Sequence, residues 1–217
     1  MNLELGARIA WNNMNTNLAL FNMERTDQQV QISTQKFKDD PNSFTYYTAN
    51  ATDGYNRGFE IETEINISDN LTISNSIGYL ITHINEFSYN EFSEDDSTII
   101  TIVKGDREQA MAPKFNSSFN VHYTHHSGLF INGNITSKDE YYFSDSHDKK
   151  SKSYSLFNVD LGYEKNNFRI SLWGRNITDV RYAVRGFYFV LEPGYGKKLY
   201  LSYGEPKEIG IKLSYQF

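Results

Sequence analysis

Apolar and polar side chains alternate with a period of two along much of this chain, and the pattern is clearest near its end. There Ile209, Ile211, Leu213, Tyr215 and Phe217 alternate with glycine or polar residues. Successive side chains of an extended strand point to opposite faces, so this segment predicts a strand with one apolar and one polar face. The same alternation recurs over residues 3–11, 59–67, 73–81, 115–123, 129–135, 157–163 and 168–172, with a more ragged strand over residues 16–30.

These segments predict about nine strands of about ten residues or more, the length that crosses a bilayer when a strand is tilted. No segment carries a helical period that is long enough, and suitably capped, to compete. Short and long connections follow one another in strict alternation. The short ones lie at residues 13–15, 68–70, 125–128 and 165–167, and the long ones at residues 33–55, 86–112, 138–153 and 178–207.

This sorting of the connections favours an outer-membrane β-barrel, whose short turns face the periplasm and whose longer loops face outward. A soluble β-sandwich has no reason to sort its loops in this way. We therefore predict an all-β chain, an antiparallel meander of about nine long transmembrane strands that is part of a larger outer-membrane barrel. Residues 1–217 form one incomplete domain in this prediction, because each unpaired backbone group of an open edge in lipid costs several kcal/mol.

The composition agrees with this prediction and excludes other classes. Tyr and Phe are abundant, at 16 and 15 residues, which is typical of β-rich chains. The absence of Cys excludes a disulfide framework and thiolate metal sites. A formal net charge of -6 argues against nucleic acid as a partner. The mean hydropathy of -0.59 and the lack of a long apolar run exclude a transmembrane helix, although such a test does not register transmembrane strands.

Charged residues lie on the polar face of several predicted strands. Glu60, Glu62 and Glu64 share one strand, and Arg169 and Lys212 lie on two others. If the apolar face meets lipid, these residues line a hydrated lumen or contact a plug; the alternative is the solvated face of an ordinary sheet. The first residues lack the basic and hydrophobic regions of a signal peptide, so we expect the chain to begin late in a longer protein.

The last strand carries a second signal. Leu213, Tyr215 and Phe217 place apolar or aromatic residues at alternate positions up to the final residue. This arrangement resembles the signal by which the barrel-assembly machinery recognises outer-membrane proteins.

Three stretches resemble the C-terminal barrel of TonB-dependent receptors. The first is Arg57-Gly58-Phe59-Glu60, continued by Ile61-Glu62. The second is Asn176-Ile177-Thr178-Asp179, followed by Arg181-Tyr182. The third opens with Pro206-Lys207-Glu208-Ile209-Gly210 and ends in Tyr215-Gln216-Phe217. Their order and separations match the family, and together they cover most of the chain.

The resemblance implies energised uptake of a scarce, bulky solute, such as a siderophore-iron complex, a cobalamin or an oligosaccharide. It implies a multi-pass barrel in a Gram-negative outer membrane, in contact with lipid and lipopolysaccharide. An N-terminal plug, the first barrel strands and a TonB box for the TonB complex are expected upstream of this chain. The alternatives are a passive porin-like or adhesin barrel, an outer-membrane hydrolase, and a soluble carbohydrate-binding sandwich.

Candidate site residues are few. Arg185, Phe187, Tyr188 and Tyr195 place a base and aromatic rings in the last long connection, where they are candidates for ligand contact, although they are equally compatible with an aromatic girdle or with a strand that extends beyond the membrane. His125 and His126 are expected to point to opposite faces of a strand or to lie in a turn, so no metal site is predicted. We find no catalytic motif and no phosphate-binding loop, and we predict neither an enzyme nor a cofactor.

Overall fold

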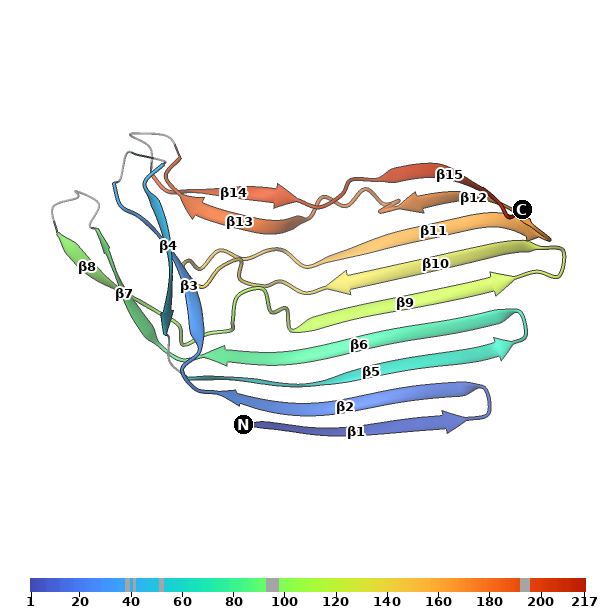
Figure 1. Ribbon diagram of the computed structural model, residues 1–217, viewed down its shortest axis with the longest axis horizontal. Helices are drawn as coiled ribbons and strands as arrows, with labels where there is room; N and C mark the ends of the chain where they lie inside the picture. The colour runs from blue at the N-terminus through green and yellow to red at the C-terminus, as the bar shows by residue number, and fades with distance from the viewer. Residues whose placement is uncertain (38–39, 41, 51–52, 93–97, 192–195) are drawn as a thin grey trace.

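A computed structural model describes residues 1–37, 40, 42–50, 53–92, 98–191 and 196–217, and these residues are all-β (Figure 1). Nine strands form one antiparallel sheet, in the order β1 (Asn2–Trp11), β2 (Met14–Arg25), β5 (Gly54–Ser68), β6 (Leu71–Ile84), β9 (Phe115–Thr124), β10 (Leu129–Lys138), β11 (Tyr154–Lys165), β12 (Phe168–Arg175) and β15 (Glu208–Tyr215). Six more form three hairpins, β3 (Gln29–Gln35) with β4 (Phe44–Asn50), β7 (Phe87–Phe92) with β8 (Ile99–Lys104), and β13 (Ala183–Phe189) with β14 (Lys198–Tyr203). The predicted nine-stranded antiparallel meander is confirmed.

The two ends of the sheet differ in how the strands are joined. Tight turns join β1 to β2, β5 to β6, β9 to β10 and β11 to β12 at one end, the tight-turn rim, and the three hairpins lie at the other end, the hairpin rim (Figure 1). Asn12 and Asn166 occupy two of the tight turns with φ of 47° and 54°, a left-handed conformation that Asn tolerates better than most residues. The predicted sorting of short and long connections is confirmed.

The long connections are more ordered than the sequence suggested, because three of them contain a hairpin. The ragged strand predicted over residues 16–30 is confirmed as β2 up to Arg25, but its end was wrong, since residues 29 and 30 belong to β3. Asp27 has a φ of 51° between these two strands, and a left-handed residue interrupts an extended strand. None of the described residues forms a helix that is long and apolar enough to span a membrane.

The strand register aligns apolar side chains of neighbouring strands, so that they form one apolar face across the whole sheet. In one row Leu5 is opposite Leu20, Leu20 opposite Phe59, Phe59 opposite Tyr79, and Tyr79 opposite Phe115. A second row runs through Ile131, Leu161, Leu172 and Ile211. Most of these side chains are exposed, Leu5 by 70% and Ile211 by 73%. Among the described residues no second layer covers this face, which a soluble sandwich would need.

The opposite, polar face carries a network of side-chain hydrogen bonds. The Asn158 amide donates to the Asn134 side-chain oxygen at 2.8 Å, and the Asn134 amide donates to that of Asn120 at 2.7 Å. These three residues are direct neighbours on β11, β10 and β9. Arg169 is ion-paired on the same face with Glu164. The face is therefore built to meet water or another polar surface.

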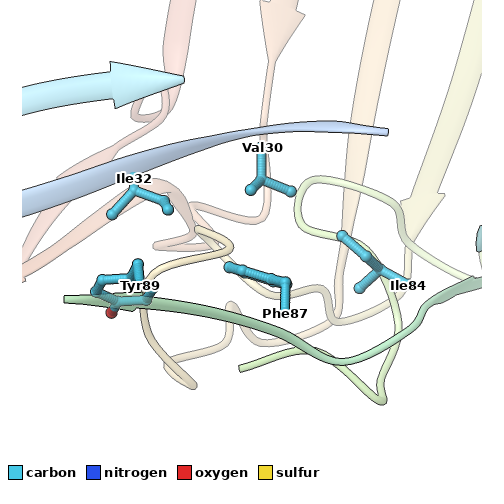
Figure 2. Packing of buried hydrophobic residues seen from close by; sticks show 5 residues of the cluster. All are labelled: Val30, Ile32, Ile84, Phe87 and Tyr89. Carbon is cyan, nitrogen blue, oxygen red and sulfur yellow. The ribbon is translucent and has the colours of Figure 1, made fainter. Parts of the chain in front are cut away.

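Most of the buried apolar residues lie at the hairpin rim, while Phe130 of β10 is buried within the large sheet. Val30 and Ile32 from β3 face Phe87 and Tyr89 from β7, and Ile84 at the end of β6 completes the cluster (Figure 2). Val30, Ile32 and Ile84 are at most 1% exposed. The sheet itself is a single layer that is open at both edges, since the described residues give β1 only β2 and β15 only β12 as neighbours.

Candidate functional site

A cavity of about 540 Å³ lies at the hairpin rim, and we call it the rim pocket. All three hairpins and residues 143–149 contribute to its walls. Aromatic rings form much of the lining: Phe44, Tyr46, Tyr89, Phe143, Phe187, Tyr188 and Phe189. The volume is within the range of about 300–1,000 Å³ that is usual for small-molecule sites. Two of its rings, Phe44 of β4 and Phe189 of β13, meet edge to face with centroids 4.7 Å apart.

The charged groups of the rim pocket are mostly paired. Lys197 binds Glu91 at 2.9 Å, and Lys104 binds Asp148 at 2.6 Å. Lys149 makes no ion pair with any described carboxylate, and its ammonium lies 4.6 Å from the centre of the Tyr188 ring. Among the described lining residues, three lysines against two carboxylates leave one net positive charge when His147 is neutral. This part of the lining combines flat apolar surfaces with one cation whose charge is not matched by a described acid.

One wall of the rim pocket belongs to a segment that we call the central loop, residues 141–149. The loop closes on itself, because the Phe143 N–H donates to the Lys149 carbonyl at 3.0 Å. The Arg107 guanidinium holds it from outside, donating to the Ser144 carbonyl at 2.8 Å and to the His147 carbonyl at 3.1 Å. This guanidinium also binds Asp148 at 2.7 Å. The wall is therefore fixed by backbone contacts as well as by charge.

Two titratable groups of the central loop have displaced pKa values. Burial lowers the pKa of His147, and the Arg107 and Lys104 cations act in the same direction, against a backbone hydrogen bond at Gly186 and the charge of Asp148. Burial by itself would raise the pKa of Asp148. The hydrogen bond from Lys104 and the charges of Lys104 and Arg107 outweigh it and hold that pKa below its usual value. Near neutral pH the wall therefore carries a neutral imidazole beside an ionised carboxylate.

The ligand-contact candidates from the sequence have different positions. Phe187 and Tyr188 line the rim pocket, whereas Arg185 is not among its lining residues. Tyr195 lies outside the described residues. Sequence reasoning missed Lys104 and the charged run His147-Asp148-Lys149, all of which line the pocket. The run itself was the available signal, but nothing local showed which wall it would join. Ligand contact by Phe187 and Tyr188 stays a prediction.

The stretch Arg57-Gly58-Phe59-Glu60 alternates between the two faces of β5. Phe59 lies on the apolar face opposite Tyr79, and Glu60 lies on the polar face. Gly58 is required by space, because a Cβ there would be 2.1 Å from the Tyr79 carbonyl oxygen and 2.9 Å from the Phe21 ring. Arg57 lies on the apolar side near the hairpin rim, where its Nε donates to Asn22 at 2.6 Å.

The stretch Asn176-Ile177-Thr178-Asp179 forms a clamp between the end of β12 and the chain that returns to β15. Asn176 is 3% exposed, and its amide donates to the carbonyls of Val180 at 3.0 Å and Glu205 at 3.1 Å. Its side-chain oxygen accepts the Val180 N–H at 2.9 Å. Asp179 accepts the Lys207 N–H at 3.1 Å. Thr178 is exposed.

The last strand presents its assembly-signal residues outward. Leu213 is opposite Ile170 and Tyr215 is opposite Phe168 on the apolar face. The Phe217 ring is fully exposed and lies edge to face with Tyr215, with centroids 5.1 Å apart. An assembly role for these residues stays a prediction.

The histidine pair at the tight-turn rim differs from one of its two predicted arrangements. The rings of His125 and His126 lie 3.8 Å apart, because β9 ends at Thr124 and both residues belong to the turn. The opposite-face arrangement was therefore wrong, and the turn is confirmed. Within the described part of the chain, no group of three or more His, Asp or Glu residues is arranged to hold a metal ion.

Comparison with known proteins adds one family and several structures. A family model described as TonB dependent receptor-like, beta-barrel, matches residues 1–177. The ferric yersiniabactin uptake receptor FyuA of Yersinia pestis superposes with a TM-score of 0.73 at 16% identity, over 100% of this chain and 29% of that chain. The siderophore receptor PiuA of Acinetobacter baumannii gives 0.71 at 20% identity, over 99% and 28%. The copper transporter OprC gives 0.73 at 13%, over 100% and 32%.

At these identities the likeness to solved structures concerns the fold. The chain spans about a third of the length of each of the three structures.

Proposed function

Because this chain belongs to the TonB-dependent receptor β-barrel family, we propose that it is the C-terminal barrel portion of a receptor that takes up a scarce, bulky solute with energy from TonB. The family places the chain in a Gram-negative outer membrane as a multi-strand β-barrel. Its members are receptors and transporters, and we propose no enzymatic activity. In such barrels the tight-turn rim faces the periplasm and the hairpin rim faces outward.

The observation that carries the proposal is the rim pocket, which opens at the outward end of the barrel wall. Its rings offer flat apolar surface, and its net positive charge favours an anionic or neutral solute. FyuA and PiuA are described as a ferric yersiniabactin receptor and a siderophore receptor. We therefore place a siderophore-iron complex first among the solutes, ahead of cobalamin and an oligosaccharide.

The polar face of the sheet also supports the proposed function, because it suits contact with a plug. Glu60, Glu62 and Glu64 are exposed along this face of β5, and the described residues give none of them an ion pair. We propose that a plug and further barrel strands from the rest of the protein cover the polar face and the open edges of β1 and β15. Contacts with TonB, the barrel-assembly machinery and lipopolysaccharide belong to the same proposal.

A passive porin-like or adhesin barrel is the alternative. It would share the strand pattern and the sorted connections, but it has no need of a lined pocket at the rim. It also predicts solute entry that does not depend on TonB.

The test is uptake by cells that carry the intact receptor, compared with cells in which its gene is deleted. Ferric citrate and ferric yersiniabactin are supplied with radioactive iron, and cobalamin with radioactive cobalt, each also in a strain without TonB. We expect one ferric complex to be accumulated by the receptor in a TonB-dependent manner. Uptake that persists without TonB would favour the passive barrel, and uptake of none of the three would oppose the proposed solute classes.

A further inference from the structure

The central loop contacts all three hairpins. On β3, the Ser33 N–H donates to the Ser146 hydroxyl at 3.1 Å, and that hydroxyl lies 3.4 Å from the Gln31 carbonyl. On β7, the Tyr89 hydroxyl donates to the Ser146 carbonyl at 3.4 Å. A segment of nine residues thus joins two hairpins through one serine.

The third hairpin contacts the same loop through its β13 strand. The Tyr141 hydroxyl donates to the Val184 carbonyl at 3.2 Å. Gly186 leaves room for the Phe143 ring, since a Cβ at this glycine would be 2.3 Å from a ring carbon. The His147 ring meets the Tyr188 ring with centroids 5.9 Å apart. The three hairpins therefore share one central contact, and their positions depend on the shape of the loop.

Arg107 connects this loop to the barrel wall. Its backbone pairs with Ile84, the last residue of β6, through N–H to carbonyl contacts of 2.9 and 3.3 Å in the two directions. Its guanidinium donates to the carbonyls of Ser144, Asp145 and His147, binds Asp148, and lies 4.2 Å from the centre of the Tyr142 ring. The Arg107 side chain is only 10% exposed. The buried guanidinium of Arg107 therefore contacts five of the nine residues of the central loop.

We infer that Arg107 is a positioning residue of the rim pocket, which holds the central loop so that the three hairpins form one preorganised pocket. This inference rests on the proposed function, because it assigns a role to Arg107 in shaping that same pocket. Arg107 does not line the cavity, and it acts through Ser144, His147 and Asp148, which do. A pocket that is already in its binding shape loses less affinity to the ordering of its walls.

The chemistry requires arginine at this position. A guanidinium is planar and donates in several fixed directions, whereas an ammonium is a point charge on a flexible stem. Lysine would retain the attraction to Asp148 but would not reach three carbonyls at once. Replacing Arg107 by Lys is therefore a conservative variant with a distinct expected result, between those of the parent and of Arg107→Ala.

The first test measures the position of the central loop without any ligand. The Ser33 backbone N–H contacts the Ser146 hydroxyl, and this chain contains no cysteine, so a Ser33→Cys, Ser146→Cys pair can form only one disulfide within it. We expect the pair to cross-link in the intact receptor and the yield to fall at least about tenfold with Arg107→Ala, because four charge-assisted hydrogen bonds are removed and the loss of one alone corresponds to about tenfold. Arg107→Lys should give an intermediate yield.

A second pair controls for the barrel itself. The Ser137 and Ser155 hydroxyls are 2.7 Å apart on β10 and β11, and a cysteine pair there should cross-link in every variant. An unchanged Ser33–Ser146 yield in Arg107→Ala overturns the inference, as does a pair that fails to cross-link in the parent. If Arg107→Ala also lowers the cross-linking yield of the control pair, the barrel has not assembled in that variant. The Arg107→Lys variant then provides the test, and a Ser33–Ser146 yield equal to that of the parent overturns the inference.

The third measurement asks whether the pocket changes with the loop. Uptake of ferric citrate, ferric yersiniabactin and cobalamin is followed in the Arg107→Ala receptor, and we expect the half-saturating concentration to rise about tenfold at an unchanged maximal rate. The matched control is Arg181→Ala, whose exposed guanidinium lies 4.0 Å from the Tyr203 ring away from the pocket. Unchanged half-saturation in Arg107→Ala overturns the inference. Uptake of none of the three by the parent refutes the proposed solutes, while the cross-link still decides the role of Arg107.

Discussion

Replacement of Asn176 by Ala should destabilise the barrel by a large amount for a single side chain. Three hydrogen bonds are lost, two from the amide to the carbonyls of Val180 and Glu205 and one from the Val180 N–H to the side-chain oxygen. At about 0.5–1.5 kcal/mol for each bond, the loss is about 1.5–4.5 kcal/mol. Asn176 also has a φ of 44°, a left-handed conformation that costs Ala about 1 kcal/mol more.

The two contributions can be separated with a second substitution and a second site. Asn176→Gly removes the same hydrogen bonds without the backbone strain, so it should be less destabilising than Asn176→Ala by about 1 kcal/mol. Asn12 has a similar φ of 47° in an exposed turn, and the described residues record no hydrogen bond for its side chain. Asn12→Ala should therefore cost only the backbone part.

The assay is denaturant unfolding of the intact receptor in detergent, followed by the fluorescence of its tryptophans, with the free energy taken from linear extrapolation. Heat-modifiable gel migration gives an independent measure of the folded fraction. A free energy of unfolding for Asn176→Ala within about 0.5 kcal/mol of the parent, or equal to that of Asn12→Ala, would refute the reasoning.

Three further predictions concern the barrel wall and the rim pocket. Gly58→Val should reduce the yield of folded receptor, because its side chain would meet the Tyr79 carbonyl, whereas Gly78→Val, with open space around the added atoms, should fold like the parent in the same gel assay. Because the pKa of His147 is lowered in the folded state, the central loop should lose stability as the pH falls through the ordinary histidine pKa of about 6.5 toward the folded pKa. Hydrogen exchange of the loop amides at pH 5 and pH 7.5 measures this loss, and equal protection at the two pH values would contradict the prediction. Tyr188→Ala should raise the half-saturating concentration of the solute severalfold while Arg185→Ala leaves it unchanged, and the reverse ranking in the uptake assay would exclude the lining as the ligand contact.

The strands of the large sheet could be predicted from sequence because their signal is local. The alternation within one segment is enough to predict which of its residues lie on the apolar face and which on the polar face. The segment from Ile209 to Phe217 shows this without information from any other strand. The sequence signal for the turns was equally local, since Asn12 and Asn166 lie directly between two alternating segments. Register then follows from matching apolar faces, because a slip by one residue would exchange the two faces.

The rim pocket could not be predicted in the same way, because its contacts join distant parts of the chain. Arg107 binds carbonyls 37 to 40 positions away, and a carbonyl is present at every residue, so no sequence pattern marks its partners. Ser33 and Ser146 meet across 113 positions. The hairpin β3–β4 was missed for a related reason, since the apolar pair Val30 and Ile32 is too short to predict a strand apart from β2.

The buried cluster around Ile32 and Ile84 gives the outward end of this protein a stability of its own. The wall of the barrel depends on the surrounding lipid or detergent, because its apolar face has no protein cover among the described residues. The hairpins, in contrast, exclude solvent mainly with their own side chains, since Val30 and Ile32 of β3 and Phe87 and Tyr89 of β7 pack with Ile84 of β6. A change of detergent should therefore loosen the wall before it loosens the hairpins, and the hairpin rim should tolerate transplantation onto a different barrel more readily than its surface position suggests.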